Sequence, residues 1–524
     1  MRAVLALAIS PLLLASDLVR YQSPQTLSFE DLTTLATVDP PPPELQAKLQ
    51  ALISTPFLSN EAAFAGYKPL APNVPGVGKV LRVAEWNINR EEKNAMMLAF
   101  SDASGFRELA GENPKLKRKA LDIAVDQAKH LQGADVIVLN EVDHGVNRTA
   151  YRDVTRDIAM ALHMNYVFAT EFIELTPLYV RSKREEKERK ESDGDNIDPK
   201  RYLGLEGSAL LSRYPIRSAR IVQLPQAYDW YHQEVHAVSE LAKAENLAGG
   251  KLVSEKLKRQ VRRGNRIMIV AELEIPGAEP GVLTMICPHL EDYSKSDGRR
   301  KQMDFVLSQI KTISTPVVMA GDLNTMGRSA APISFKSEIK NNVLNYRFWA
   351  RLAIYNFVPL PGVSYGVAGW NYVRGLHDPT VANFPIIAPS HERAMFEDIH
   401  HFRFDDGSSF EWEGHKTDSY RHKSRALSVT NERGAKGFEP SFEFGRTFGG
   451  MVGSYKLDWI FVKEPASLRP YQGRTLRALN HAPAQMISDH SPTTVDLVLR
   501  PLSVAQQKLP NDDTRKGASS LDSQ

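Results

Sequence analysis

Acidic, amide and imidazole side chains interrupt a series of apolar, strand-length segments in this sequence. Each polar residue stands near the end or the beginning of an apolar run. Side chains presented at strand ends are held by a rigid scaffold, which positions chemistry well. The residues concerned are Asn87, Glu141, His289, Asp322, Asn324, Asp458, Asp489 and His490.

The chemical types of these residues suit phosphoryl transfer. Glu141, Asp489 and the Asn87 amide supply hard oxygen ligands, which fit Mg²⁺ or Mn²⁺ and not a thiol-loving metal. The two histidines and the other carboxylates remain for proton transfer and charge stabilisation. A phosphoester hydrolase needs this combination: a cation on the phosphate oxygens, a base for water, and a donor for the developing charge.

Each of these motifs has a plainer interpretation when it is taken alone. Asn87 could be an ordinary turn residue, and Glu141 a solvated strand end. His289 could be a structural histidine, and Asp322-Leu-Asn324 a simple Asx-turn. The functional hypothesis depends on the whole set, which falls in order on separate strand ends.

The elements that must position these residues are short apolar runs rich in β-branched side chains. Helical patterns separate several of them, notably at 116–131 and 299–312. Strands mixed with helices favour two packed sheets covered by helices on their outer faces. In an antiparallel sandwich the start of one strand lies beside the end of its neighbour, so all the polar groups could meet at one rim. The predicted strands are 80–86, 135–139, 208–211, 267–273, 282–286, 316–320, 457–462 and 493–499.

The ordered set of strings resembles the endonuclease/exonuclease/phosphatase superfamily, also called the deoxyribonuclease I-like fold. The resemblance covers roughly 80–499 apart from insertions, and it implies an α+β fold, a four-layer α/β/β/α sandwich with two mostly antiparallel sheets. The matching strings are Trp86-Asn87-Ile88, Leu139-Asn140-Glu141, Glu206 to Pro215, His289-Leu290, Gly321-Asp322-Leu323-Asn324, Leu457 to Phe461, and Ser488-Asp489-His490-Ser491-Pro492.

The resemblance implies a metal site on this chain. Glu141, assisted by Asn87 and Asp489, would hold Mg²⁺ against a non-bridging phosphate oxygen, and Mn²⁺ could substitute. No organic cofactor is expected.

The resemblance also implies the catalytic roles. Asp322 would position or deprotonate the attacking water, and Asn324 would hydrogen-bond the phosphate. His490 would stabilise the transition state, oriented and kept protonated by Asp458, because a nearby opposite charge raises the pKa of an imidazole. His289 would contact the phosphate from the other side.

The resemblance implies one further role, and the sequence departs from the family pattern at several positions. In the deoxyribonuclease-like subgroup a glutamate orients this histidine, and Glu206 is the candidate here. Asn140 stands where the family commonly has glutamine, Ser208 replaces a frequent asparagine, and Pro288 precedes His289 in place of a small polar residue. Arg148 could add a phosphate clamp, although a surface arginine is the plainer interpretation.

Composition limits the class of protein. The 524 residues carry a formal charge of +3, which argues against a dedicated nucleic-acid coat protein. The single cysteine, Cys287, excludes a disulfide framework and a multi-cysteine zinc site.

The chain divides into one large catalytic domain with extensions and insertions. Residues 1–19 resemble a signal segment, which predicts export to the periplasm or the outside, with a cytoplasmic location as the alternative. Residues 20–78 form an N-terminal extension, 79–500 the domain, and 501–524 a polar tail predicted to be disordered. The insertions lie at about 181–201, 231–266 and 327–450.

The substrate is left open among DNA, RNA, phospholipid, and sugar or inositol phosphates, because a fold does not name a substrate. A basic cluster could track a nucleic-acid backbone, or it could be a solvated helix face. We expect a monomeric Mg²⁺-dependent phosphoester hydrolase acting by in-line attack of water, with no protein partner. The alternative is a non-catalytic binding protein on the same fold. The basic cluster consists of Lys256, Lys258, Arg259, Arg262, Arg263 and Arg266.

Overall fold

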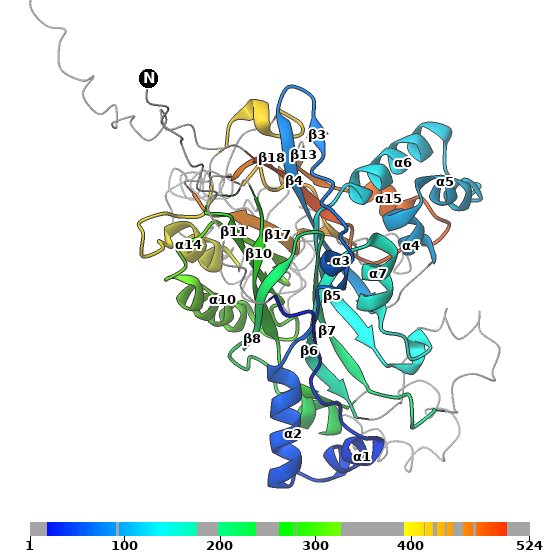
Figure 1. Cartoon of the computed structure of the whole chain (residues 1–524), viewed down its shortest axis with the longest axis vertical. Helices are drawn as coiled ribbons and strands as arrows, with labels where there is room; N and C mark the ends of the chain where they lie inside the picture. The colour runs from blue at the N-terminus through cyan, green and yellow to red at the C-terminus, as the bar shows by residue number, and fades with distance from the viewer. Residues whose placement is uncertain are drawn as a thin grey trace, which may run out of the picture.

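The structure is a computed structural model of the chain, and Figure 1 shows two β-sheets packed face to face with helices on their outer sides. It describes residues 18–90, 94–175, 197–236, 261–276, 278, 280–325, 392–412, 414–422, 427–434, 437–443, 454–464 and 468–499.

The larger sheet has ten strands, and the long apolar runs of the sequence form its centre. All its pairings are antiparallel except that between β4 and β5, which run parallel. The strand order is β1 (Tyr21–Gln22), β2 (Phe57–Ser59), β6 (Asn165–Glu174), β7 (Leu205–Ser212), β5 (Val136–His144), β4 (Gly78–Arg90), β19 (Thr493–Leu499) and β18 (Leu468–Thr475), with β3 (Asn73–Val74) paired to β4 and β9 (Arg262–Gly264) to β6.

The smaller sheet has five strands and one parallel pair, β11 with β12. Its order is β17 (Asp458–Val462), β12 (Val317–Asp322), β11 (Val282–Pro288), β10 (Ile267–Glu274) and β8 (Ile216–Gln223). Two small ribbons accompany it, β13 (Arg433–Gly434) with β14 (Gly437–Phe438), and β15 (Phe442–Glu443) with β16 (Ser454–Tyr455).

Helices cover the outer face of each sheet (Figure 1). In α6 (Arg118–Gln132), for example, residues Ala124, Val125, Ala128 and Leu131 recur at helical spacing and are buried. The larger sheet carries α6 together with α1 (Phe29–Thr37), α2 (Pro43–Ser54), α3 (Glu61–Phe64), α4 (Asn94–Ser101), α5 (Ala103–Gly111), α7 (Val154–Leu162) and α15 (Arg477–His481). The smaller sheet carries α10 (Ser296–Ile310) and α14 (Arg393–His401).

The core consists of three apolar layers, as a four-layer sandwich requires. One lies between the larger sheet and its helices, one between the two sheets, and one between the smaller sheet and α10 and α14. Val83 and Val138 face Ile269 and Met285 in the middle layer, where Cys287 is also buried. The predicted α+β sandwich with helices outside both sheets is confirmed.

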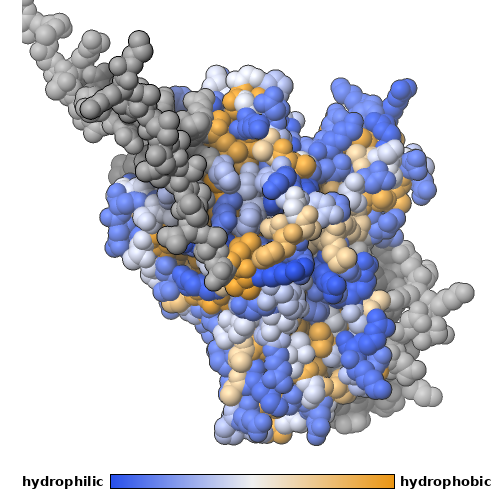
Figure 2. All heavy atoms as spheres, viewed as in Figure 1, coloured by the Kyte–Doolittle hydropathy of each residue, from blue (hydrophilic) through white to orange (hydrophobic). Residues whose placement is uncertain are grey.

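The predicted N-terminal extension is part of the larger sheet, since β2 pairs with β6 and β1 pairs with β2. Residues 1–17, 176–196, 237–260, 326–391 and 501–524 lie outside the described residues, with most of the predicted signal segment, the predicted tail and much of the insertions. Among the described helices, none has the length and apolar character to cross a membrane. On the face in Figure 2, hydrophobic residues form patches between hydrophilic ones.

Candidate active site

The larger sheet brings Asn87 and Glu141 together because β4 and β5 run parallel and end side by side. Their register pairs Asn87 with Asn140, and both strands then contain an irregularity. At that point Glu141 adopts a positive φ of 52°, which turns its side chain out of the regular alternation. The Asn87 amide Nδ2 lies 3.2 Å from Glu141 Oε1.

The smaller sheet brings His289 and Asp322 together by the same parallel arrangement, here of β11 and β12. A Cβ on Gly321 would stand 2.0 Å from the carbonyl oxygen of Pro288, so only glycine permits this close approach. The backbone N–H of Leu290 then donates to the Asp322 carbonyl at 3.0 Å. On the other side of β12, the antiparallel register places Asp322 opposite Asp458.

The Asp322 carboxylate lies close to predicted site residues from both sheets. Its Oδ2 accepts a hydrogen bond from Asn87 Nδ2 at 3.0 Å. The same oxygen lies 3.9 Å from His289 Nε2 and 3.8 Å from His490 Nε2. Burial, followed by the Asp458 charge, raises the pKa of Asp322 although both imidazoles oppose this shift. The structure therefore brings these predicted site residues from both sheets to one carboxylate.

His490 is held from behind by a buried carboxylate. Its Nδ1 lies 2.9 Å and 3.0 Å from the two oxygens of Asp458, and its backbone carbonyl accepts from Trp86 Nε1 at 2.9 Å. Burial alone would lower the pKa of His490, but the charges of Asp458 and Asp322 raise it well above the ordinary value. His490 is therefore held as an imidazolium whose Nε2 points at Asp322.

His289 is likewise held by a buried carboxylate, that of Glu171 in β6. Its Nδ1 lies 2.9 Å from Glu171 Oε2 and 3.0 Å from Oε1. Burial and the neighbouring Arg266 lower the pKa of His289, whereas Glu171 and Asp322 raise it, and the net shift is upward. The prediction that Glu206 orients His289 is corrected, since Glu171 occupies that position.

Glu206 belongs to a separate network of buried charges. Its carboxylate lies 3.1 Å from Arg90, 3.6 Å from Arg262 and 3.9 Å from Arg148. Burial would raise the pKa of Glu206, but these guanidinium groups hold it at about 2. Arg148 is buried and hydrogen-bonded to Asp143, so it is neither a surface residue nor free to clamp a phosphate.

Asn324 and Asp489 complete the set. Asn324 has a positive φ of 47°, and its backbone N–H donates to Asp322 Oδ1 at 2.8 Å. Its Nδ2 donates to the Leu290 carbonyl at 2.9 Å, which leaves one Nδ2 hydrogen for another acceptor. Asp489 is half-buried, and the Ser488 hydroxyl lies 3.3 Å from its Oδ1 and 2.8 Å from the Asn87 carbonyl.

In the described part of the chain, Asp322, Asp458 and His490 form one group whose possible metal-ligand atoms all lie within 4.8 Å of one another. His490 Nδ1 is already bonded to Asp458, and an imidazolium has no lone pair for a metal. Glu141 and Asp489 instead offer partly exposed carboxylate oxygens beside Asn87, and this oxygen-donor set suits a hard divalent cation.

Sequence reasoning missed Glu171, Glu85 and Lys456. Glu85 stands two residues before Asn87, and strand alternation puts it on the same face one step deeper, so its position could have been found. Burial and the charges of Asp458 and Asp322 raise its pKa well above normal. Burial lowers the pKa of Lys456, which precedes Asp458 by two, to about 8.

The basic cluster does not form a free phosphate track where the structure describes it. Arg262 pairs with Glu234 and Arg263 with Asp39, both through hydrogen bonds shorter than 3.0 Å. Arg266 is buried against Glu171 and His289. Lys256, Lys258 and Arg259 lie outside the described residues.

An aromatic cluster borders the His289 side of the site. The rings of Trp230 and Tyr293 lie 4.8 Å apart and those of Tyr228 and Tyr293 5.3 Å apart. The Arg266 guanidinium lies 5.9 Å from the Trp230 ring, which connects the cluster to His289. Tyr293 is 47% exposed and so presents an aromatic surface to solvent beside the site.

Solved structures that resemble the chain include three proteins with low sequence identity. They are an endonuclease/exonuclease/phosphatase from Beutenbergia cavernae (16% identity, 80% of this chain and 72% of that chain covered, TM-score 0.36), the human Nocturnin catalytic domain (13%, 80% and 95%, 0.35), and a mannosyl-6-phosphatase from Bacteroides thetaiotaomicron (13%, 80% and 99%, 0.34).

No curated protein matches the sequence closely enough to add a finer assignment. The model of the Endonuclease/Exonuclease/phosphatase family matches residues 84–490, from β4 to His490, and so includes all the predicted site residues. The chain therefore belongs to the Endonuclease/Exonuclease/phosphatase family, a family of phosphoric ester hydrolases.

Proposed function

We propose that the protein hydrolyses a phosphoester with the help of Mg²⁺, by in-line attack of water. The observation that supports this most is the convergence on Asp322 of two imidazoles, one from each sheet. Each imidazole is held from behind by a buried carboxylate, Glu171 for His289 and Asp458 for His490. Two imidazoles whose pKa values are both raised fit a phosphate, which gains negative charge in its transition state.

Asp322 is the base in this proposal. Its Oδ1 is fixed by the backbone N–H of Asn324, and its Oδ2 lies in the space between the two imidazoles. Its raised pKa makes the carboxylate a better proton acceptor than an ordinary aspartate. The remaining Nδ2 hydrogen of Asn324 is available to a phosphate oxygen.

His490 and His289 bind and stabilise charge. The raised pKa of His490 keeps a proton on Nε2 at neutral pH, where it can be donated to a phosphate oxygen. His289 contributes a second imidazole, from the smaller sheet, and Glu171 fixes the orientation of its ring. A hydrogen-bond donor of this kind accounts for about 10²- to 10³-fold in rate in other hydrolases.

Members of the family generally depend on a divalent metal ion. On this chain Glu141 and Asp489 would hold it, and Asn87 would join them after its amide rotates, since Nδ2 now faces the carboxylates. When bound, Mg²⁺ supplies Lewis-acid stabilisation to a phosphate oxygen. Mn²⁺ has similar ligand preferences and should substitute.

The test is hydrolysis of bis(p-nitrophenyl) phosphate with Mg²⁺ or Mn²⁺, by the wild type and by Asp322→Ala and His490→Ala. We expect each variant to lose at least about 10²-fold in kcat. Asp122→Ala, on the exposed face of α6, is the matched control and should keep the wild-type rate. Equal rates in all four proteins would favour the rival hypothesis, a non-catalytic binding protein on the same fold.

Metal binding has its own test, which does not need activity. Mn²⁺ binding measured by calorimetry should weaken at least about tenfold in Glu141→Gln and in Asp489→Asn. His490→Ala should bind Mn²⁺ as the wild type does, because His490 is proposed to carry a proton rather than a metal. If Mn²⁺ binding is lost only in His490→Ala and Asp458→Asn, the metal site lies at that group instead.

The substrate and the location of the protein are further proposals. The ion pairs of Arg262, Arg263 and Arg266 favour a small phosphoester over a long nucleic acid. A panel of DNA, RNA, phospholipid and sugar phosphates tests this preference. Export through residues 1–19 stays a prediction, and fractionation of cells expressing the full chain checks it.

A further inference from the structure

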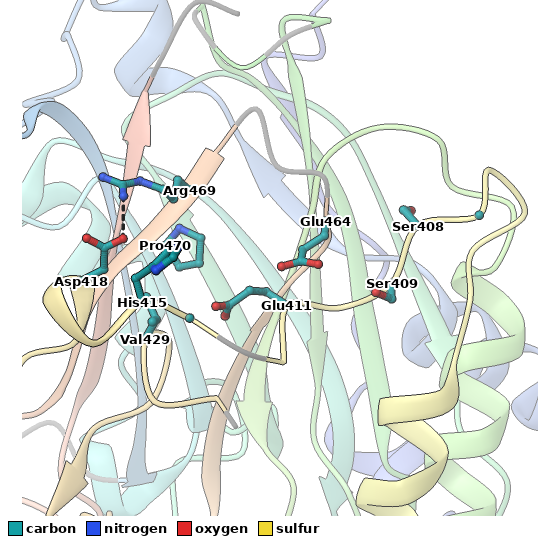
Figure 3. A pocket seen from close by; sticks show the side chains of 11 residues that line it. Ser408, Ser409, Glu411, His415, Asp418, Val429, Glu464, Arg469 and Pro470 are labelled. Atoms are coloured by element: carbon teal, nitrogen blue, oxygen red, sulfur yellow. Dashed lines mark hydrogen bonds and ion pairs between the residues drawn. The ribbon is translucent and has the colours of Figure 1, made fainter. Parts of the chain in front are cut away.

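A second cavity lies away from the Asp322 site, between the loops that flank η2 (Lys416–Asp418) and the ends of β17 and β18. Its volume is about 560 Å³. Asp458 begins β17 at the active site, whereas Glu464, two residues beyond the end of this strand, lines the cavity. The five-residue strand separates the two places by about 13 Å at the usual rise per residue. The cavity, whose lining residues are drawn in Figure 3, is therefore a separate place on the molecule.

The charged lining of the cavity is mainly acidic. Glu411, Asp418 and Glu464 contribute carboxylates, and Arg469 contributes a guanidinium. Arg469 Nη1 donates to Asp418 Oδ2 at 2.5 Å, so these two charges offset each other. Two carboxylates are left over, Glu411 and Glu464, and they make the cavity attractive to a cation.

Glu411 is the group that points most clearly to a ligand. Its side chain is 5% exposed, and no hydrogen bond reaches its Oε2 from any described residue. Figure 3 shows its carboxylate directed toward Val429 and His415, with Glu464 beside it. A buried carboxyl oxygen without a partner is costly, by about 1–3 kcal/mol, and a cationic donor would remove that cost.

The geometry favours a larger ligand over a single metal ion. Among the described residues, the group of three with ligand atoms close enough for one ion lies at Asp322 and not here. A volume of about 560 Å³ is also far larger than one ion needs, and it falls in the range of small-molecule sites. Val429 and Pro470 add apolar wall next to the carboxylates.

We propose that this cavity binds a small organic cation that carries protonated amines on a short apolar chain. Glu411 and Glu464 would accept hydrogen bonds from the amines, and Val429 and Pro470 would contact the carbon chain. This inference is independent of the proposed phosphoester hydrolysis, because none of these residues takes part in the site around Asp322.

The proposal predicts proton release on binding. Burial, and then the charges of Glu464 and Asp418, raise the pKa of Glu411 to about 8. Arg469 and His415 are the other charged or titratable groups that line the cavity. A cation binds the ionised form of Glu411, so its affinity should increase as the pH rises toward 8 and then level off. With that pKa, binding should be about 25-fold tighter at pH 8.5 than at pH 6.5.

The experiment is isothermal titration calorimetry of the full chain with 1,4-diaminobutane, with 1,4-butanediol as the uncharged probe of similar shape. We expect saturable binding of the diamine at pH 8.5, about 25-fold weaker binding at pH 6.5, and no binding of the diol. Glu411→Gln should weaken diamine binding at least about tenfold and remove most of the pH dependence. Glu397→Gln, an exposed residue of α14, should change nothing.

Several results would overturn the proposal. They are diol binding as tight as that of the diamine, unchanged binding in Glu411→Gln, tighter binding of Ca²⁺ than of the diamine at these residues, and absence of saturable binding at pH 8.5. If Glu411→Gln does not fold, Glu464→Gln takes its place, since Glu464 is less buried. The hydrolytic rate of each variant with bis(p-nitrophenyl) phosphate should equal that of the wild type.

Discussion

Replacing Glu171 with glutamine is the sharpest test of how His289 is held. The substitution keeps the shape of the side chain and removes its charge. In the native site the Glu171 carboxylate accepts from His289 Nδ1 at 2.9 Å, and Arg266 Nη1 donates to the same Oε2 at 2.9 Å. Arg266 keeps a second partner, Asp292, at 2.9 Å, so the variant does not leave the guanidinium without a carboxylate.

The magnitude follows from the bond that is lost. A hydrogen bond to a charged group contributes about 1.5–3 kcal/mol. If that energy orients and protonates His289 in the transition state, kcat/KM should fall about 10- to 100-fold in Glu171→Gln. The pKa of His289 should also fall, because the carboxylate that raised it is gone while Arg266 still lowers it.

The assay is the pH profile of kcat/KM for bis(p-nitrophenyl) phosphate, together with NMR titration of the His289 ring. A histidine with a raised pKa stays protonated to higher pH, so losing the carboxylate should move the alkaline limb of the profile to lower pH. Glu206→Gln is the matched control, because Glu206 lies against Arg90, Arg148 and Arg262. It should lower stability and leave the pKa of His289 unchanged.

The reasoning fails if Glu206→Gln shifts the pKa of His289 and Glu171→Gln does not. It also fails if Glu171→Gln lowers the rate only in proportion to a loss of folded protein. The thermal unfolding curve of each variant gives the fraction of folded protein at the assay temperature. That fraction separates a loss of folded protein from a specific effect on the rate.

Four other predictions follow from single contacts. Gly321→Ala should lower kcat at least tenfold with p-nitrophenyl esters, since its Cβ would meet a backbone oxygen at 2.0 Å and separate the strands that carry the site. Tyr293→Ala should raise KM several-fold for aryl esters and leave kcat unchanged, because this exposed ring borders the site. Arg299→Met should lower the free energy of unfolding in urea by about 3–5 kcal/mol, because it removes one partner of the buried ion pair between Arg299 and Glu392. Burial and nearby guanidinium groups hold the pKa of His130 well below 6.5, so below that pH the unfolded chain takes up a proton that the folded chain does not. The free energy of unfolding should therefore fall below about pH 6.5, by up to about 1.4 kcal/mol per pH unit. His130→Gln should remove that slope from the pH dependence of urea unfolding.

The sequence predicted the strands that end in the site because they are buried on both faces and mostly apolar. Runs such as 80–86 and 282–286 lie in the middle of the sandwich, so their hydrophobic pattern is strong and their polar ends stand out. The antiparallel neighbours expected from the sequence explain only in part why the polar residues at these strand ends meet. Asn87 and Glu141 meet because their strands are parallel, and so do His289 and Asp322.

The sequence could not select Glu171 over Glu206 as the partner of His289. Both glutamates stand in long strands of the larger sheet, and both are buried. What separates them is which side chain faces the smaller sheet, and that depends on an irregularity in the pairing of β6 with β7 between Thr170 and Phe172. A shift of one residue reverses the face of a strand, and spacing along the chain does not reveal it.

That same region gives a physical reason for two departures from the family pattern. Asn140 Nδ2 donates to the Ser208 hydroxyl at 2.8 Å, and the hydroxyl donates to Glu171. Asn140 Oδ1 accepts the backbone N–H of Asp322 at 3.1 Å. Asn140 is shorter than the glutamine that the family commonly has, and Ser208 is shorter than the frequent asparagine. These two side chains contact each other, so the two departures occur at one contact. Because this contact joins the backbone of the base to the carboxylate behind His289, the residues at 140 and 208 should tolerate change only as a pair.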